Sequence, residues 1–79
     1  MTAFEKLVQD YDEFEYNYDP YGYGDAFSDR EEARAVTRNA LVDGAFRQAI
    51  IDRLVGIADE DDEYTAAALE LINRISKVA

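Results

Sequence analysis

The chain of 79 residues contains no cysteine and no histidine. Without cysteine, neither a disulfide bridge nor a thiolate zinc site can stabilise the fold. Without histidine, the sequence lacks the commonest general base and the commonest metal ligand in proteins. No phosphate-binding loop or cofactor fingerprint compensates for these absences. We therefore expect a protein that is not an enzyme and that uses no cofactor and no metal.

Long apolar runs are also missing. No stretch approaches the ~18–20 apolar residues that a membrane-spanning helix needs. The first ten residues, MTAFEKLVQD, have neither the basic start nor the apolar stretch of a signal peptide. We expect residues 1–79 to form one small cytoplasmic domain.

Basic residues are scarce: eight lysines and arginines stand against 18 acidic residues, for a net charge of −10. This charge argues against nucleic acid or an anionic membrane as a direct ligand, because both select for lysine and arginine. It favours a basic protein surface as the partner. The charge is uneven, at −7 over residues 1–29, +1 over residues 30–58 and −4 over residues 59–79.

Helical patterns cover most of the chain. A capping-box spacing at Thr2 and Glu5 opens a predicted helix over residues 3–13, and a second such spacing at Ser28 and Glu31 opens another. Gly44 is expected to end or bend that second helix. Apolar residues at helical intervals predict further helices over 45–58 and 64–78. The fold class is therefore all-α, a small bundle of three to four helices.

Residues 13–27 are ambiguous. Phe14, Tyr16 and Tyr18 alternate with polar residues, which is strand periodicity, and the sequence DPYG at 19–22 suits a type I turn. We expect a loop packed by its own tyrosines. The alternative is one short two-stranded hairpin, which would make the fold α+β, although such a hairpin is weak in isolation.

Five of the six tyrosines lie between Tyr11 and Tyr23, interleaved with acids. Tyrosine offers flat contact area with few torsions to restrict, which suits interfaces. Ion pairs and cation–π contacts would let this segment bind an arginine-rich protein. The alternative is a structural role, in which the tyrosines fill a core and the acids maintain solubility. The predicted partner-binding residues are Asp10, Asp12, Glu13, Glu15, Tyr16, Tyr18, Asp19, Tyr21, Tyr23 and Asp25.

A second acidic patch consists of Asp59, Glu60, Asp61, Asp62 and Glu63. Its ordinary role would be to cap the last helix and to complement the helix dipole. A calcium loop counted from Asp59 fails, because its sixth position is Tyr64 and an EF-hand needs glycine there.

Arg30, Arg34 and Arg38 recur every four residues and share one helix face. In so acidic a chain, we expect this stripe to dock against the chain's own acidic segment or to lie in solvent. Glu70 and Arg74 have the i,i+4 spacing of an ordinary helical ion pair.

The stretch AFRQAIIDRLVGIA, residues 45–58, is the most apolar part of the chain. Ile51 and Val55 widen its apolar stripe beyond a single face, so this helix is either central or covered by another chain. Phe46, Ile51 and Val55 are therefore candidates for self-association, with a homodimer as one outcome.

In size, acidity and lack of enzyme motifs, the chain resembles the small acidic proteins with which phages block host defence, such as nucleic-acid mimics and anti-CRISPR proteins. The resemblance implies an inhibitor that occupies the basic nucleic-acid-binding surface of a partner. One alternative is an immunity protein or antitoxin that neutralises a cognate nuclease. Another is a self-assembling structural or adaptor module.

Overall fold

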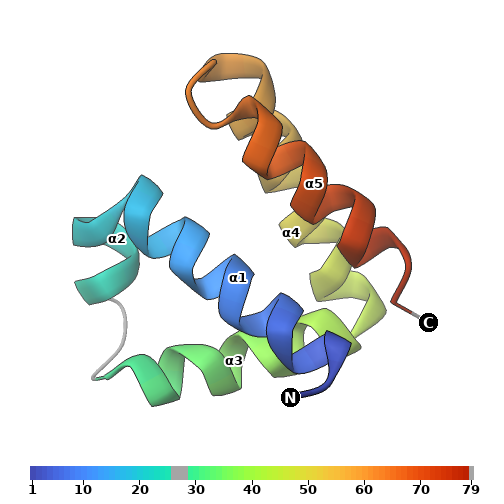
Figure 1. Cartoon of the computed structure of the whole chain (residues 1–79). Coiled ribbons are helices and arrows are strands. Elements are labelled where there is room, and N and C mark those ends of the chain that lie inside the picture. The colour runs from blue at the N-terminus through green and yellow to red at the C-terminus, as the bar shows by residue number, and fades with distance from the viewer. Residues whose placement is uncertain (26–28, 79) are drawn as a thin grey trace.

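The computed structural model describes residues 1–25 and 29–78, with backbone only for 23–25, and these residues form helices but no strand. The elements are α1 (Ala3–Tyr18), α2 (Pro20–Asp25), α3 (Arg30–Val42), α4 (Gly44–Glu60) and α5 (Thr65–Ser76) (Figure 1). The prediction of an all-α bundle is confirmed.

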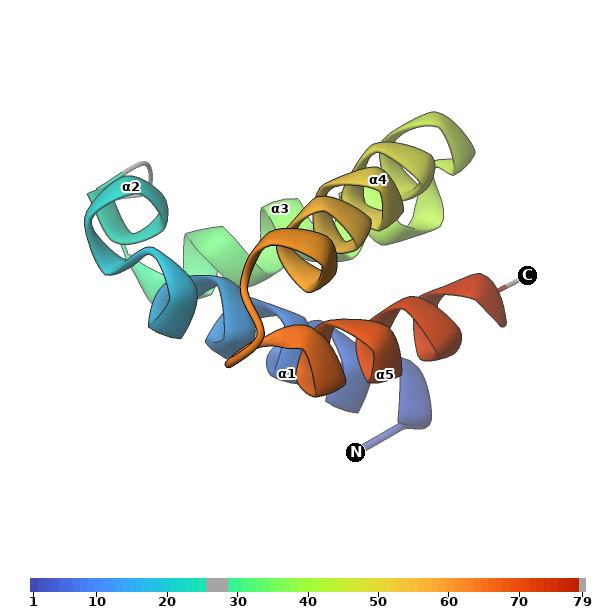
Figure 2. The same ribbon diagram turned by 90° about the horizontal axis from the view of Figure 1, so that it is seen from above.

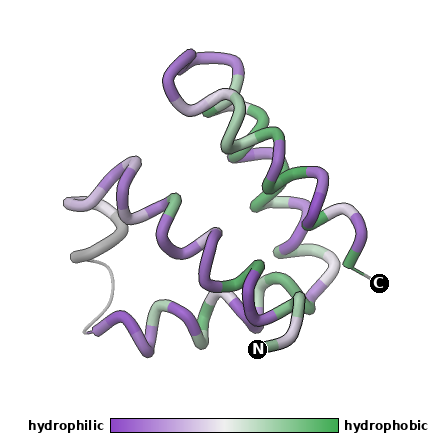
Figure 3. Tube along the Cα trace, viewed as in Figure 1, coloured by the Kyte–Doolittle hydropathy of each residue, from purple (hydrophilic) through white to green (hydrophobic). Residues whose placement is uncertain are grey.

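The four longer helices form two layers, with α1 and α5 in one and α3 and α4 in the other (Figure 2). Helix α1 packs against α3 and α5, and α4 packs against α3 and α5. Helices α1 and α5 run antiparallel, so the first turn of α1 lies beside the last turn of α5. Figure 3 shows that the most hydrophobic stretches belong to α4 and α5, whereas the segment from the second half of α1 into α2 is mainly hydrophilic.

The core lies between the two layers. Every long helix contributes to it, and the buried residues of each helix recur at the three- and four-residue intervals that define one helix face. Its buried apolar members are Leu7, Val8, Tyr11, Phe14, Leu41, Leu54, Ile57, Ala68, Leu71 and Ile75. Helix α1 supplies four of these residues, and the helices predicted from the apolar periodicity of residues 45–58 and 64–78 supply five.

Helix α1 continues five residues beyond its predicted end at residue 13. Phe14 and Tyr18, four residues apart, stack with ring centroids 6.2 Å apart, and both contact Tyr64 edge-on. The period of four places these rings on one face against α5, so helical packing overrides the local alternation of apolar and polar residues. The predicted loop and its hairpin alternative are therefore both wrong over residues 13–25; residues 26 and 27 lie outside the described part.

The predicted turn at residues 19–22 begins α2. The carboxylate of Asp19 accepts a hydrogen bond from the backbone N–H of Gly22 at 2.9 Å, as a helix N-cap does. A type I turn has nearly helical dihedral angles, so it can lead directly into a helix. The sequence DPYG therefore marks a corner between two helices.

Helix α3 begins at an N-cap one residue later than predicted. Oδ1 of Asp29 accepts a hydrogen bond from the N–H of Glu32 at 2.7 Å, while Ser28 lies outside the described residues. At the other end of α3, Asp43 is both the C-cap of α3 and the N-cap of α4. Gly44 is the first residue of α4, so the break comes one residue before the predicted glycine.

Candidate interaction surface

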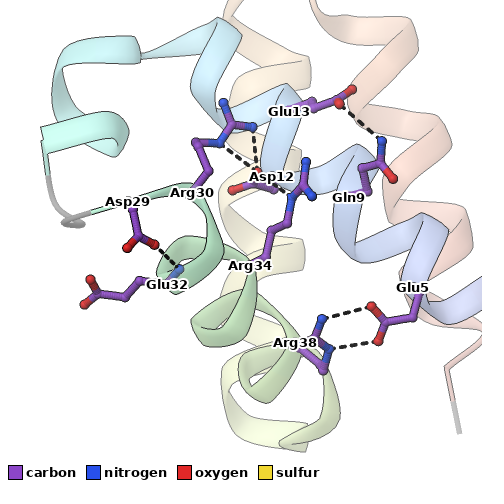
Figure 4. A network of polar contacts seen from close by, with 9 residues as sticks. All are labelled: Glu5, Gln9, Asp12, Glu13, Asp29, Arg30, Glu32, Arg34 and Arg38. Atoms are coloured by element: carbon purple, nitrogen blue, oxygen red, sulfur yellow. Dashed lines mark hydrogen bonds and ion pairs between the residues drawn. The ribbon is translucent and has the colours of Figure 1, made fainter.

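Asp12 is fully buried between α1 and α3. Its Oδ2 accepts hydrogen bonds from Nη2 and Nε of Arg30, at 2.6 and 3.1 Å, and Nε of Arg34 lies 3.5 Å away (Figure 4). Charge-assisted bonds of this kind offset the cost of taking a carboxylate out of water. Asp12 therefore binds α3 to α1 and offers no surface to a partner.

Arg38, the third member of the arginine stripe, binds Glu5 of α1. Its Nε and Nη2 donate to the two oxygens of Glu5 at 2.8 and 2.9 Å (Figure 4). The hydrogen bond from Arg38 lowers the pKa of Glu5, and the same bond raises the pKa of Arg38. The prediction that the stripe docks against the chain's own acidic segment is thus confirmed for Arg30 and Arg34, whereas Arg38 binds Glu5, which precedes that segment.

Asp10 joins α1 to α5. Nη1 of Arg74 donates to its Oδ2 at 2.8 Å, and Nζ of Lys6 lies 3.1 Å from Oδ1. Partial burial acts to raise the pKa of Asp10, but the hydrogen bonds from Arg74 and Lys6 and their charges outweigh it, and the pKa lies below its ordinary value. Arg74 therefore binds a carboxylate on another helix instead of the predicted Glu70.

Glu15 joins α1 to α4 and is only 4% exposed. Its Oε2 accepts hydrogen bonds from Nε of Arg53 at 2.7 Å and from the hydroxyl of Tyr11 at 3.2 Å. Burial acts to lower the pKa of Arg53, but the hydrogen bond and charge of Glu15 raise it above its ordinary value. Oε1 of Glu15 is buried and accepts no hydrogen bond from the described residues.

Four carboxylates of α1 thus engage six of the eight basic side chains of the protein. The predicted contact surface is therefore wrong for Asp12 and Glu15, which are buried, and Asp10 is held in a network within the chain. In a helix, successive residues are about 100° apart, so the acids of residues 10–15 point in several directions. Among the predicted acids of residues 10–15, Glu13 is the exposed one.

The tyrosines of the same segment divide into separate environments. The guanidinium of Arg30 lies 4.5 Å from the ring centre of Tyr16, which is 39% exposed. Tyr18 is half-buried against Phe14 and Tyr64, whereas Tyr21 is 82% exposed. The side chains of Tyr23 and Asp25 lie outside the described part. Tyr16 and Tyr18 therefore make contacts within the protein, and among the described tyrosines of this segment only Tyr21 has a strongly exposed ring.

The second acidic patch, residues 59–63, forms the turn between α4 and α5, and we call it the acidic tip. Asp59 and Glu60 end α4 and Asp61 caps it, so the acids stand mainly at a helix C-terminus instead of capping α5 as predicted. The N-cap of α5 is Tyr64, which makes no side-chain capping bond. Within the described residues, no basic side chain forms an ion pair with the acidic tip.

The backbone of the acidic tip is held firmly. The hydroxyl of Thr65 donates to the carbonyls of Ala58 and Asp61, at 2.7 and 3.1 Å, which closes the turn. Tyr64 anchors the turn by its contact with Tyr18, whose ring centroid is 5.0 Å away. The tip carboxylates therefore project from an ordered turn.

A shallow depression of about 290 Å³ runs along the α1–α5 pair, and the ion pair of Asp10 and Arg74 lines part of it. Phe14 and Asn17 line it from α1, and Ala67 and Leu71 line it from α5. The exposed acids Glu13 and Glu70 stand on its two sides. Glu70 was not among the predicted site residues, because its i,i+4 spacing to Arg74 indicated a helical ion pair.

The candidate self-association residues do not form one patch. Phe46 and Val55 are 62% and 51% exposed, but nine residues separate them, which is two and a half helical turns and places them on opposite sides of α4. Ile51 is half-buried against the core. Phe46 instead lies beside Val36 of α3, where both line a depression of about 300 Å³.

None of the described helices has the length and apolar character needed to cross a bilayer. Over residues 1–25 and 29–78, no group of three or more potential ligands could hold a metal ion. No protein-family model matches the chain, and neither a curated protein nor a solved structure is significantly similar to it.

Proposed function

We propose that this protein is a non-enzymatic inhibitor that binds the basic, nucleic-acid-binding surface of a partner protein. The acidic tip, together with Glu13 and Glu70, would place carboxylates where the partner normally holds phosphates. The observation that carries the proposal is the division of the basic residues. Six of eight are bound to carboxylates of α1, while the acidic tip has no ion-pair partner among the described residues.

The position of these acids supports a role in binding. Asp59 and Glu60 stand at the C-terminal end of α4, where negative charge opposes the helix dipole by ~0.3–1 kcal/mol per group. The same residues also repel one another. Acids that lower stability in an ordered turn are more readily explained by a partner than by capping.

The mechanism is competition in the cytoplasm for a surface that nucleic acid would occupy. Complementary charge would speed association, and contacts of Tyr18 and Tyr64 beside the acidic tip would slow dissociation. Because these charges are exposed, salt at about 0.5 M would screen them strongly.

The test is capture of partners from a nuclease-treated bacterial lysate, followed by mass spectrometry. Two double variants each neutralise two acids and so change the net charge from −10 to −8. The tip variant is Asp62→Asn/Glu63→Gln, and the control variant, with its changes elsewhere, is Glu31→Gln/Asp52→Asn. We expect the wild type and the second variant to capture the same nucleic-acid-binding protein in low salt. The tip variant should lose it, and so should the wild type in about 0.5 M salt.

Equal capture by both variants would show that net charge, and not the acidic tip, directs binding, which would contradict the proposal. The captured protein also has to lose its DNA or RNA binding when the inhibitor is added. An immunity protein or antitoxin would use the same acidic surface. It would differ from a general inhibitor in the range of its partners, because it would bind one nuclease and ignore related ones.

A self-assembling module is the third function. It draws support from the exposed side chains of Phe46 and Val55. Under this alternative, Val55→Glu would convert an oligomer into a monomer, whereas the inhibitor proposal expects a monomer of 9.0 kDa throughout. Sedimentation equilibrium at high protein concentration separates the two.

A further inference from the structure

A second depression lies at the opposite end of the α1–α5 pair from the acidic tip. It has a volume of about 540 Å³, within the range of ~300–1,000 Å³ that is typical of small-molecule sites. Its lining is mostly apolar. It comes from the first turns of α1, from the last turn of α5 and from the two residues that follow α5. The lining residues are Ala3, Phe4, Lys6, Leu7, Arg74, Lys77 and Val78.

The charge around this groove is opposite to that of the whole protein. Both lysines of the chain, Lys6 and Lys77, line it together with Arg74, although the net charge is −10. Asp10 binds Lys6 and Arg74, so the four groups sum to +2. Lys77 is exposed and forms no ion pair with any described carboxylate.

We propose that this groove binds a small amphiphilic carboxylate, meaning an aliphatic chain that ends in one carboxyl group. The aliphatic chain would lie against Phe4, Leu7 and Val78, where burial of apolar surface contributes ~25 cal/mol per Å². The carboxylate would sit at the rim beside Lys77 and Lys6. This inference does not depend on the proposed inhibitor function, which uses the other end of the molecule.

Charge and size select this ligand class over others. A cationic amphiphile would meet a rim whose four charged groups sum to +2, and repulsion between like charges disfavours it. A protein partner needs about 1,000 Å² or more of buried surface for a specific interface. A short anionic aliphatic chain, in contrast, matches both the volume of the groove and the basic character of its rim.

The test is a titration of the full chain with decanoate, followed by ¹H–¹⁵N NMR. We expect shifts that saturate and that are largest at the amides of Phe4, Leu7 and Val78. Butyrate, which has the same head group and a short chain, should bind at least tenfold more weakly. Decyltrimethylammonium should leave these amides unshifted and perturb the acidic surfaces instead.

Two variants test the two parts of the groove. Lys77→Gln should weaken decanoate binding roughly two- to fivefold, which corresponds to ~0.4–1 kcal/mol and lies within the range of an exposed ion pair. Ala3→Trp, at an exposed position in the first turn of α1, should fill the groove and weaken binding at least tenfold. The control Asn17→Asp changes the net charge as Lys77→Gln does, but lies ~15 Å along α1 from Leu7, and should leave binding unchanged.

Three outcomes would overturn the proposal. Decanoate at about 1 mM, the range of weak specific binding, could leave the groove amides unshifted. Butyrate and decanoate could shift them equally, which would indicate only a salt effect on the lysines. Finally, Ala3→Trp could bind decanoate as the wild type does while retaining the wild-type circular dichroism spectrum.

Discussion

Asp12 and Arg30 face each other between α1 and α3, with Nη2 of Arg30 2.6 Å from Oδ2 of a carboxylate that has no exposed surface. The two members of the pair differ in environment, since the side chain of Arg30 is 42% exposed. Removing the exposed cation therefore does more than break a surface ion pair. It leaves the buried charge with less compensation.

The first prediction concerns this buried carboxylate. Replacing both of its cations, in Arg30→Gln/Arg34→Gln, should lower the free energy of unfolding by about 3–5 kcal/mol, as when a buried ion pair loses one partner. Adding Asp12→Asn to that variant should recover part of the loss, because the buried group is then neutral. Urea denaturation of the three variants measures both effects. A triple variant less stable than the double variant would contradict this account.

The second prediction is a dependence of stability on pH. The pKa values of Glu5 and Asp10 are lowered in the folded protein, from ordinary values of 4.5 and 3.8. Their contribution to stability is therefore complete above those values and is lost as the pH falls below them, through the folded-state pKa values. We expect wild type to have a higher Tm than Glu5→Gln/Asp10→Asn at pH 7.

That difference in Tm should narrow below about pH 4.5 and disappear once both groups are protonated. Comparing the two proteins at each pH removes the effect of the other acids, which titrate in both. A Tm difference that stays constant from neutral to strongly acidic pH would show that the ion pairs with Arg38, Arg74 and Lys6 do not contribute.

The third prediction is that Asp59 and Glu60, the first two residues of the acidic tip, lower stability. Asp59→Asn and Glu60→Gln should each raise the free energy of unfolding by ~0.3–1 kcal/mol, because both residues lie in the last turn of α4. Glu31→Gln is the matched control, since Glu31 lies in the first turn of α3, where negative charge is favourable. It should lower stability by a similar amount. Equal effects of the same sign at both helix ends would contradict the dipole explanation.

The fourth prediction compares two glycines. A Cβ added at Gly56, inside α4, would meet no heavy atom within 4 Å, so Gly56→Ala should stabilise the protein by ~0.5–1 kcal/mol. A Cβ at Gly22 would run into the carboxylate of Asp19, which accepts the hydrogen bond that begins α2. Gly22→Ala should therefore lower stability. Thermal unfolding measures both, and a shift of the same sign for the two variants would be inconsistent with the structure.

Helix caps and apolar periodicity predicted most of the fold. Thr2 caps α1 as expected, with its hydroxyl accepting from the N–H of Glu5 at 3.0 Å, and the apolar face of α5 is buried as predicted. The end of α1 was mispredicted because the alternation at Phe14, Tyr16 and Tyr18 is a local signal. The contact of Tyr18 with Tyr64, which is 46 positions away in the sequence, extends the helix instead.

The candidate surface was harder to predict. Charge patterning showed that Arg30, Arg34 and Arg38 share a face, but it could not show which acids they would bind. Asp12 is buried and Glu13 is exposed, although the two residues are adjacent and of the same charge type. The direction in which each points depends on how α1 is rotated against α3, and that rotation is a property of the packed bundle.

Asp43 closes α3 and opens α4 within a single residue, since its N–H donates to the carbonyl of Asn39 and its carboxylate accepts from the N–H of Ala45. The two helices therefore share a boundary that leaves no spare residue between them. Inserting or deleting one amino acid here would rotate α4 by about 100° relative to α3 and turn Leu54 and Ile57 away from the core. In evolution, any change in length between α3 and α4 should be strongly disfavoured, whereas substitutions at this boundary need only retain a capping side chain.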